Sequence, residues 1–374
     1  MSDSAAGTDI TVALYGRTDV GIVRTSNEDH FAVADLDGDA RPTAGGDVAG
    51  PVTVAVRERG PLVVVCDGMG GAAAGEVASA LAVEVVVDRM REAPRAADRQ
   101  ELARHLRRAV RAANRAVFDK SHSHWKLRGM GTTLSAVAMF GGELVLAQVG
   151  DSRAYLFRNG ALVQITRDQS VVAALLQAGR ITPDEADRFA ASNIILQALG
   201  VQEDVDVALS LAPLRRGDRL LVCSDGLHGP VDDDEIAEVL AAHADPRAAA
   251  DALIERARDA GGPDNITAVV ADFAGEGLPA PAGPDDLPRF MEIDPAEDGE
   301  RAITTTSHVA RRLAARAGVT DDPGPRPIPA TDQHAAIDDG GDGDAPAVPR
   351  RLGAAWLLAA IAVAAAAALW LWGR

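Results

Sequence analysis

The sequence predicts a mixed α/β domain in which helices cover β-sheets. Four apolar runs that end near Gly or Asp indicate buried strands, and two longer stretches show helical periodicity. We expect strands at 62–66, 144–149, 219–223 and 266–270, and helices at 75–91 and 100–120. In the second helix, Leu102, Leu106 and Val110 share one face, and arginines occupy the opposite face. No internal repeat is evident, so helices packed on sheets follow.

The composition fits a folded domain with an aliphatic core. Of the 374 residues, 47% are hydrophobic and only 3% are aromatic. A net charge of -18 argues against proteins that bind nucleic acid through basic charge, so no nucleic-acid partner is expected. Two cysteines and a polar N-terminus favour a cytoplasmic domain over a disulfide-built secreted one.

Composition also divides the chain. We expect an N-terminal tail over residues 1–9, the domain that carries the chemistry over 10–275, and a disordered linker over 276–350. Between residues 276 and 349 there are 15 acidic residues, 6 basic residues, 11 prolines and 8 glycines, and such a segment buries little apolar surface. A basic stretch at 301–316 is interpreted as solvated chain, with a phosphorylation or docking site as the alternative.

The C-terminal segment is apolar. Residues 352–372 contain no charged side chain, and a helix of this length spans about 31 Å, the thickness of a bilayer core. Tryptophans lie near both ends, and Arg350 and Arg351 precede the segment. These features predict a single-pass transmembrane helix at 352–372 that leaves residues 1–350 on the cytoplasmic side of the cell membrane. A soluble alanine-rich helix is the alternative.

Aspartates stand at the ends of several predicted strands. They are Asp67, Asp151, Asp225 and Asp264. One such Asp usually forms a turn or caps a helix, but four together suggest a cluster that needs hard divalent cations. Oxygen ligands favour Mg2+ or Mn2+ over Zn2+. Two such ions can activate a water for in-line attack on a phosphorus atom.

Phosphate chemistry also needs a cation for the phosphate oxygens. Arg24 is the candidate, because its planar guanidinium matches phosphate geometry and stays charged. Two further carboxylates, Glu28 and Asp29, follow it closely in the sequence. The alternative for Arg24 is a solvated surface charge.

Six motifs occur in one order between residues 10 and 273. They are Asp19–Asp29, Val65–Glu76, Gly129–Thr133, Val149–Tyr155, Cys223–Leu227 and Gly262–Thr267. In these motifs the sequence resembles the metal-dependent, type 2C family of serine/threonine protein phosphatases, in its bacterial form. The resemblance implies an α-β-β-α sandwich of two central sheets flanked by helices, with a metal centre at one end. It also implies hydrolysis of phosphoserine and phosphothreonine in proteins.

The resemblance further implies roles for individual residues. Asp67 would bridge two Mn2+ or Mg2+ ions, the Gly68 carbonyl would assist, and Asp225 and Asp264 would complete the ligand set. Glu28 and Asp29 would hold metal-bound waters, Arg24 would bind the substrate phosphate, and Asp151 would ligate a third, weaker metal. Phosphorylated proteins are the expected substrates, and a serine/threonine kinase at the membrane is the expected partner.

Three positions depart from the pattern. Met69 stands where some members have a proton-donating His, so no side-chain general acid is predicted. In the segment 168–206, which corresponds to the family's mobile flap, Gln169 replaces a common His, and 189–193 lack the usual His-Pro-Arg character. No substrate contacts are assigned there. The alternative function is a non-catalytic phosphoprotein-binding regulatory module with the same fold, although the retained Asp67, Asp225 and Asp264 favour an enzyme.

Two other features have a structural interpretation. The glycine-rich segment 68–75 lacks the Gly-Lys-Ser/Thr ending of a P-loop, and its glycines are expected to let the backbone approach a metal. Cys66 and Cys223 each precede a predicted metal-binding Asp by one or two positions. We interpret them as small buried hydrophobes, with a redox sensor as the alternative.

Overall fold

A computed structural model describes residues 10–38, 43–44, 52–70, 74–186 and 194–295. The strands are β1 (Thr11–Asp19), β2 (Asp29–Asp35), β3 (Thr43–Ala44), β4 (Val52–Ala55), β5 (Pro61–Met69), β6 (Gly131–Thr132), β7 (Leu134–Phe140), β8 (Glu143–Val149), β9 (Arg153–Arg158), β10 (Ala161–Gln164), β11 (Ala208–Pro213), β12 (Arg219–Cys223), β13 (Ile266–Ala274) and β14 (Met291–Ile293). The helices are α1 (Ala74–Glu92), α2 (Arg99–Ser123), α3 (Val171–Gln177), α4 (Pro183–Ala186), α5 (Asp225–His228), α6 (Asp233–Ala242) and α7 (Pro246–Asp259), with a 3-10 turn at Trp125–Leu127.

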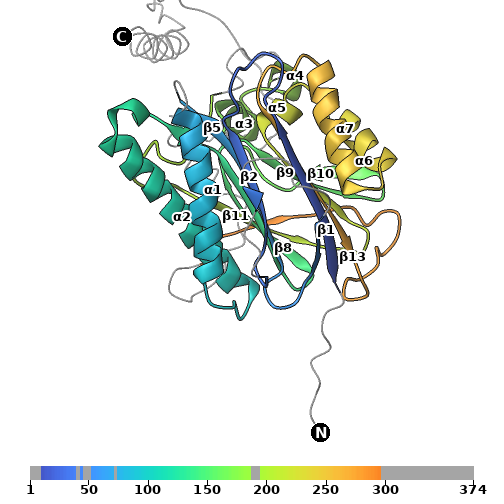
Figure 1. The fold of residues 1–374 in the computed structure, drawn as a ribbon. Helices are drawn as coiled ribbons and strands as arrows, with labels where there is room; N and C mark the ends of the chain where they lie inside the picture. The colour runs from blue at the N-terminus through green and yellow to red at the C-terminus, as the bar shows by residue number, and fades with distance from the viewer. Residues whose placement is uncertain (1–9, 39–42, 45–51, 71–73, 187–193, 296–374) are drawn as a thin grey trace, which may run out of the picture. The chain divides into compact units, whose positions relative to one another are not determined.

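The described strands form two antiparallel sheets. One sheet has the order β10-β9-β12-β13-β1-β4, and the other runs β14-β11-β8-β7-β5-β2-β3 with β6 paired to β5. Helices α1 and α2 pack on the second sheet, and α7 packs on β1 and β13 of the first. Figure 1 shows these helices on the two outer sides of the sheets. The predicted α/β class with helices covering two sheets is confirmed.

The predicted strands lie within β5, β8, β12 and β13, and the predicted helices correspond to α1 and α2. Strand β5 shows why such runs are continuously apolar. Val63 and Val65 face the core shared by the two sheets, whereas Leu62, Val64 and Cys66 belong to the core under α1 and α2. Because successive side chains point to opposite faces and both faces are covered, no position in the run is free to be polar.

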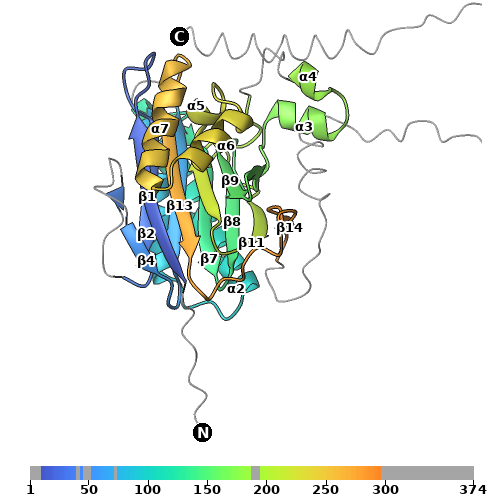
Figure 2. The same cartoon turned by 90° about the vertical axis from the view of Figure 1, so that its right-hand side faces the viewer.

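The folded domain continues past the boundary predicted at residue 275. Leu278 is buried in the core, and β14 pairs with β11, with Ile293 opposite Leu209. Figure 2 shows β14 beside β11. We call residues 276–295 the strap. The expectation of a linker starting at 276 is therefore wrong for the strap, because an average composition over the whole segment conceals a few residues that bury apolar surface and pair their charges.

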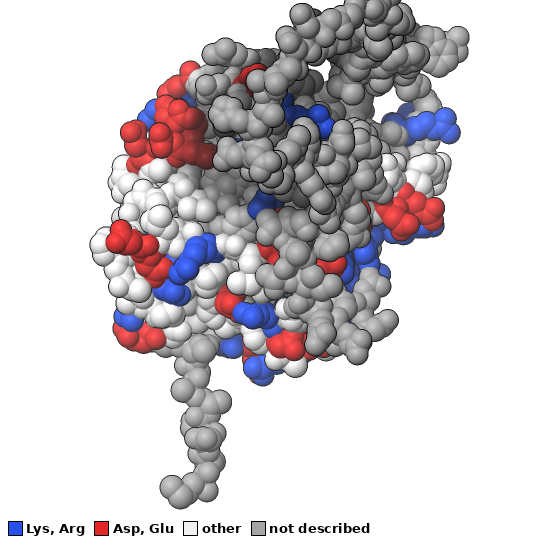
Figure 3. Space-filling view, turned by 180° about the vertical axis from the view of Figure 1, so that it is seen from behind, with Lys and Arg blue, Asp and Glu red and all other residues white. Residues whose placement is uncertain are grey.

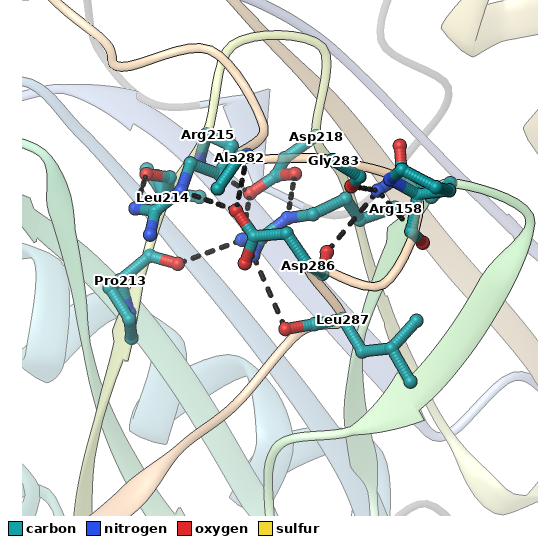
Figure 4. A network of polar contacts seen from close by, with 11 residues as sticks. Arg158, Pro213, Leu214, Arg215, Asp218, Ala282, Gly283, Asp286 and Leu287 are labelled. Atoms are coloured by element: carbon teal, nitrogen blue, oxygen red, sulfur yellow. Dashed lines mark hydrogen bonds and ion pairs between the residues drawn. The ribbon is translucent and has the colours of Figure 1, made fainter.

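The strap is fixed by a cluster of four charged residues, the strap network, which consists of Arg158, Arg215, Asp218 and Asp286 (Figure 4). Arg158 donates to both carboxylate oxygens of Asp218 at 2.7 Å. Asp286 accepts from Arg158 Nη1 at 3.2 Å, from Arg215 Nε at 2.9 Å and from the Ala282 backbone N–H at 2.9 Å. The Ala282 amide and Arg215 hold the pKa of Asp286 at about 2. Two guanidinium groups thus match two carboxylates.

Several predictions concern residues outside the described ranges. These are the tail at 1–9, the rest of the linker, the basic stretch at 301–316 and the transmembrane helix at 352–372. Within the residues that the structure does describe, no helix has the length and apolar character needed to cross a membrane. On the described surface seen in Figure 3, blue and red side chains are interspersed rather than gathered into one basic face.

Candidate active site

Both sheets deliver acidic residues to the same end of the sandwich. Asp29 begins β2 and lies opposite Asp67, near the end of β5, in the antiparallel register. Asp225 begins α5 soon after β12, and Asp264 precedes β13, which pairs with β12. Neighbouring antiparallel strands place the end of one beside the start of the next, so these residues meet. We call Asp29, Asp67, Asp225 and Asp264 the acidic centre.

The carboxylates of the acidic centre disfavour one another's ionisation. Burial, together with the charges of Asp225 and Asp264, raises the pKa of Asp29 to about 8 despite two hydrogen bonds to its carboxylate. Burial raises the pKa of Asp67 well above its usual range, and the charge of Asp29 and a hydrogen bond with Asp225 act in the same direction. Four carboxylates this close are ionised together only if a cation offsets their charge.

Two buried oxygen atoms support a cation in this place. Asp29 Oδ2 accepts hydrogen bonds from Ser224 Oγ at 2.6 Å and Thr267 Oγ1 at 2.7 Å. Asp29 Oδ1 and Asp225 Oδ1, in contrast, are buried without a hydrogen-bond partner among the described residues. A buried carboxylate oxygen without a partner is costly, and hard divalent cations prefer such oxygens. The residues present therefore fit Mg2+ or Mn2+.

Arg24 contacts the acidic centre directly. Its Nη2 donates to Asp264 Oδ2 at 2.7 Å, and 52% of the Arg24 side chain is exposed. In the described part of the chain, His, Cys, Asp and Glu side chains do not stand in any group of three or more that could hold a metal ion as they are placed. The fit to a cation therefore rests on the two unpartnered carboxylate oxygens and on the type of donor atom. The Arg24 guanidinium and the hydrogen bond between Asp67 and Asp225 offset the carboxylate charge in this arrangement.

Glu28 lies against the glycines of the Val65–Glu76 motif. Its backbone oxygen accepts from the Gly68 N–H at 3.1 Å. A Cβ atom at Gly68 would lie 2.5 Å from that oxygen, and one at Gly75 would lie 2.2 Å from Glu28 Oε2. Any larger residue at these two positions would displace Glu28 from the site. The glycines therefore permit the close approach of Glu28. That they let the backbone approach a metal stays a prediction.

Asn265 organises the loop that carries Arg24 and Glu28, although no role was predicted for it from the sequence. Buried Asn265 donates from Nδ2 to the backbone oxygens of Val20 and Ser26, both at 2.9 Å, and accepts from the Glu28 N–H at 2.8 Å. Its position directly after Asp264, a predicted metal ligand, was the one feature of the sequence that pointed to a place near the site. The partners lie more than 230 positions away in sequence, so the contact itself was not predictable from spacing.

Asp151 lies beside the acidic centre. Burial raises its pKa to about 7, and the charge of Asp225 contributes to the rise. Its backbone oxygen is 3.1 Å from His228 Nε2 on α5. Burial lowers the pKa of His228 to about 4, so the ring is neutral at pH 7 and donates from Nε2. His228, which the sequence analysis did not select, thus links Asp151 to the helix that begins with Asp225.

The described part of the flap begins with two anchored residues. Asp168 accepts from Arg153 Nη2 at 2.8 Å. Gln169 is buried, accepts from the Gly150 N–H at 3.0 Å through Oε1 and donates its own backbone N–H to the Gly150 oxygen at 2.9 Å. Gln169 therefore supports the backbone next to Asp151. Residues 189–193, where the other departure was noted, lie outside the described ranges.

Both cysteines are buried free thiols. Burial raises the pKa of Cys66 and of Cys223 above the usual range. Because the thiolate is the reactive form, neither cysteine has the environment of a redox sensor. The interpretation as small buried hydrophobes is confirmed.

Comparison with known proteins identifies relatives over this same region. Residues 51–268 match the family described as Protein phosphatase 2C. The serine/threonine phosphatase stp of Listeria monocytogenes is 36% identical over 256 residues, which cover 68% of this chain and 94% of the relative. The serine/threonine protein phosphatase PstP of Mycobacterium tuberculosis is 40% identical over 258 residues, 68% of this chain and 44% of the relative. A structure of the PstP catalytic domain in complex with two manganese ions has a TM-score of 0.58 at 39% identity, and the match covers 71% of this chain and 99% of that one.

Proposed function

Because this chain belongs to the protein phosphatase 2C family, we propose that its acidic centre hydrolyses phosphoserine and phosphothreonine in proteins with two divalent ions, Mn2+ or Mg2+. Its class is that of a metal-dependent serine/threonine phosphatase. The observation that carries the assignment of the site is the pair of buried, unpartnered oxygens, Asp29 Oδ1 and Asp225 Oδ1. Ser224, Thr267 and the strand register orient the Asp29 carboxylate. Both oxygen atoms are of the kind that a hard divalent cation prefers as a ligand.

The residues that would hold the ions are Asp67, the carbonyl of Gly68, Asp225 and Asp264, with Glu28 and Asp29 beside them and Asp151 at a third position. When bound, such ions supply a water of lowered pKa and stabilise negative charge on the phosphate oxygens. The chain itself fixes the geometry. Thr133 Oγ1 accepts a hydrogen bond from the backbone N–H of Asp67 at 3.0 Å, and Thr132 Oγ1 donates one to the backbone oxygen of Asp67 at 2.7 Å.

Arg24 would bind the substrate phosphate. Its guanidinium is half exposed at the mouth of the acidic centre and already contacts a carboxylate, Asp264, whose charge and planar geometry resemble those of a phosphate edge. On binding, the guanidinium would exchange Asp264 for the phosphate oxygens. Met69, two residues after Asp67, cannot donate a proton, so the chain provides no side-chain general acid at that position.

Hydrolysis of a phosphothreonine peptide by the full-length chain tests this function. We expect turnover with Mn2+ or Mg2+, none with a chelator and none in Asp225→Asn. Asp285→Asn, which changes an exposed Asp of the strap in the same way, should retain the activity. Equal activity of Asp225→Asn and the unmodified chain would exclude the acidic centre as the catalytic site.

A membrane anchor is a separate part of the proposal. The uncharged segment 352–372 would hold the catalytic domain at the cytoplasmic face of a membrane, close to a serine/threonine kinase that supplies its phosphorylated substrates. Deletion of residues 350–374 should move the protein from the membrane to the soluble fraction. A deleted protein that still sediments with membranes would contradict the anchor and leave the phosphatase activity untouched.

A further inference from the structure

An apolar groove of about 100 Å³ opens beside the acidic centre. Its lining combines one residue of β5 with the C-terminal part of the flap segment 168–206, and consists of Met69, Ile195, Leu196, Gln197, Ala198, Val201, Gln202, Asp204 and Val205. Two of the apolar side chains are open to solvent, with Met69 38% and Val201 53% exposed. Apolar surface gathered in a concave site rather than scattered singly is typical of ligand binding.

The groove and the acidic centre share strand β5. Asp67 and Met69 are alternate residues of this strand, so their side chains leave the same face about 7 Å apart. Strand β6 connects the two sites. Met69 of β5 pairs with Gly131 of β6. The next residue, Thr132, donates from Oγ1 to the backbone oxygen of Asp67 and from its backbone N–H to the backbone oxygen of Leu199 at 3.1 Å. The wall of the groove is thereby held in register with the proposed catalytic residues.

Buried polar contacts fix the wall of the groove. Asn114 of α2 donates from Nδ2 to the backbone oxygens of Gln202 at 3.1 Å and Glu203 at 2.8 Å, and it accepts from the Gly200 N–H at 2.8 Å. Gln197 Oε1 accepts from the Asp206 N–H at 3.0 Å. A site that is already ordered loses little conformational entropy when it binds a ligand.

A glycine lies close to two of the apolar side chains that line the groove. A Cβ atom at Gly131 would lie 3.0 Å from Val201 Cγ2 and 3.4 Å from Met69 Cγ. A side chain at position 131 would therefore press against both of these apolar side chains. The rim carries the exposed carboxylate of Asp204, which lines the groove, whereas exposed Glu203, next to it in the chain, forms an ion pair with Arg115.

We propose that this groove binds an apolar side chain of the phosphoprotein substrate, located within about two residues of the phosphorylated Ser or Thr. An extended peptide advances about 3.3–3.6 Å per residue, so two residues span the separation of Asp67 and Met69. The carboxylate of Asp204 disfavours an acidic residue at the same substrate position. The inference rests on the proposed phosphatase function and adds a sequence preference to it.

Two series of phosphothreonine peptides test the preference. They carry Leu, Ala or Asp two residues before or after the phosphothreonine and are hydrolysed by the full-length chain with Mn2+. In one series we expect kcat/KM for Leu to exceed that for Ala by about tenfold and Asp to fall below Ala. Val201→Asp should bring the ratio of Leu to Ala close to one, and Val201→Ser should reduce it in part. Because both peptides are measured with the same variant, a general loss of activity lowers both values of kcat/KM and leaves their ratio unchanged.

Val52→Asp is the matched control, because Val52 is also an exposed valine (39%) but lies on β4 of the other sheet. It should keep the ratio of the unmodified chain. Equal kcat/KM for the Leu, Ala and Asp peptides in both series would overturn the inference, and so would an unchanged Leu-to-Ala ratio in Val201→Asp. In either case, hydrolysis of p-nitrophenyl phosphate would still support the phosphatase function. Loss of hydrolysis of that small substrate in the unmodified chain would refute the proposed function and the preference together.

Discussion

The acidic centre and the strap network use the same residue types with opposite results. In the strap network, Asp218 and Asp286 are matched by Arg158 and Arg215, and the three side chains of Arg158, Asp218 and Asp286 are at most 5% exposed. In the acidic centre, four aspartates face one arginine that is half exposed, and two buried carboxylate oxygens have no partner among the described residues. Matched charges hold a segment in place, whereas unmatched charges leave room for a ligand.

The pKa directions express the same difference. Hydrogen bonds from the Ala282 amide and Arg215 lower the pKa of Asp286 to about 2, so this carboxylate is stabilised as an anion. Burial and neighbouring carboxylates raise the pKa of Asp29 to about 8, so this carboxylate is destabilised as an anion. When a cation binds to a site with destabilised anions, the free energy of the site falls. That decrease is available for function rather than for folding.

The largest effect is expected from Asp67→Asn, which removes the carboxylate predicted to bridge two ions. We expect kcat to fall by about 10^4-fold, equivalent to about 5.5 kcal/mol, because the proposed centre acts as a unit. Mn2+ binding, measured by calorimetry, should weaken in parallel, and the free energy of unfolding without metal should not decrease. Wild-type Mn2+ affinity in this variant would separate Asp67 from the metal site.

The corresponding change in the strap network is Asp218→Asn, which should affect folding rather than catalysis. It leaves the buried guanidinium of Arg158 with fewer anionic partners, and breaking a buried pair costs about 3–5 kcal/mol. Denaturant unfolding measures the loss. Glu92→Gln breaks the exposed pair with Arg89 and should stay within about 0.5 kcal/mol. A similar small loss for Asp218→Asn would show that the strap network contributes little to stability.

Arg24→Ala sharpens the comparison at the arginine that contacts the acidic centre. Removal of a charged hydrogen-bond donor to phosphate costs about 1.5–3 kcal/mol, so we expect KM for phosphopeptides to rise by about 10- to 100-fold. Mn2+ affinity should change far less, and Arg24→Lys should recover part of the loss because it keeps the charge without the planar fork. Unchanged steady-state kinetics would remove Arg24 from the substrate site.

The sequence predicted those parts of the molecule in which a local pattern determines the structure. The apolar run of β5 and the arginine-lined face of α2 have the periodicity of their elements, and the structure confirms both. Three residues of the acidic centre, Asp67, Asp225 and Asp264, were also predictable as a set, because each adjoins such a run. Asp29 was selected only as a carboxylate that follows Arg24 closely in the sequence. Its roles in metal binding and catalysis remain predictions.

The contacts that were not predictable join distant parts of the chain. Asn265 reaches Glu28, and Asp286 reaches Arg158, across sequence separations that no periodicity records. The strap illustrates the physical reason. Leu278 and Ile293 are isolated apolar residues in a Pro-rich, acidic segment, and only the edge of β11 and the charges of Arg158 and Arg215 make their burial favourable. Composition alone therefore placed the end of the domain too early.

Per pH unit, the smallest change in free energy is expected from protonation, and it should have opposite signs in the two regions. An acid whose pKa is higher in the folded state, as for Asp29 at about 8 against about 3.9 when unfolded, binds more protons when folded. The free energy of unfolding of the metal-free protein should therefore fall as pH rises from 5 to 8, by up to about 1.4 kcal/mol per pH unit. For Asp286 the pKa is lowered, so its contribution is complete above about pH 4 and is lost as pH falls towards 2.

Urea unfolding of the full-length chain in a chelator, from pH 3 to 8, measures both contributions as differences between variants. Asp29→Asn should flatten the profile above pH 5 and leave the acid limb unchanged, whereas Asp286→Asn should lower stability above pH 4 and flatten the acid limb. Asp285→Asn, an exposed neighbour of Asp286, should change neither limb. If both substitutions altered the same limb, the two regions would not differ in the way their charges are balanced. Saturating Mn2+ should abolish the dependence on Asp29 alone, because a cation can offset charge only where the carboxylates have been left unmatched.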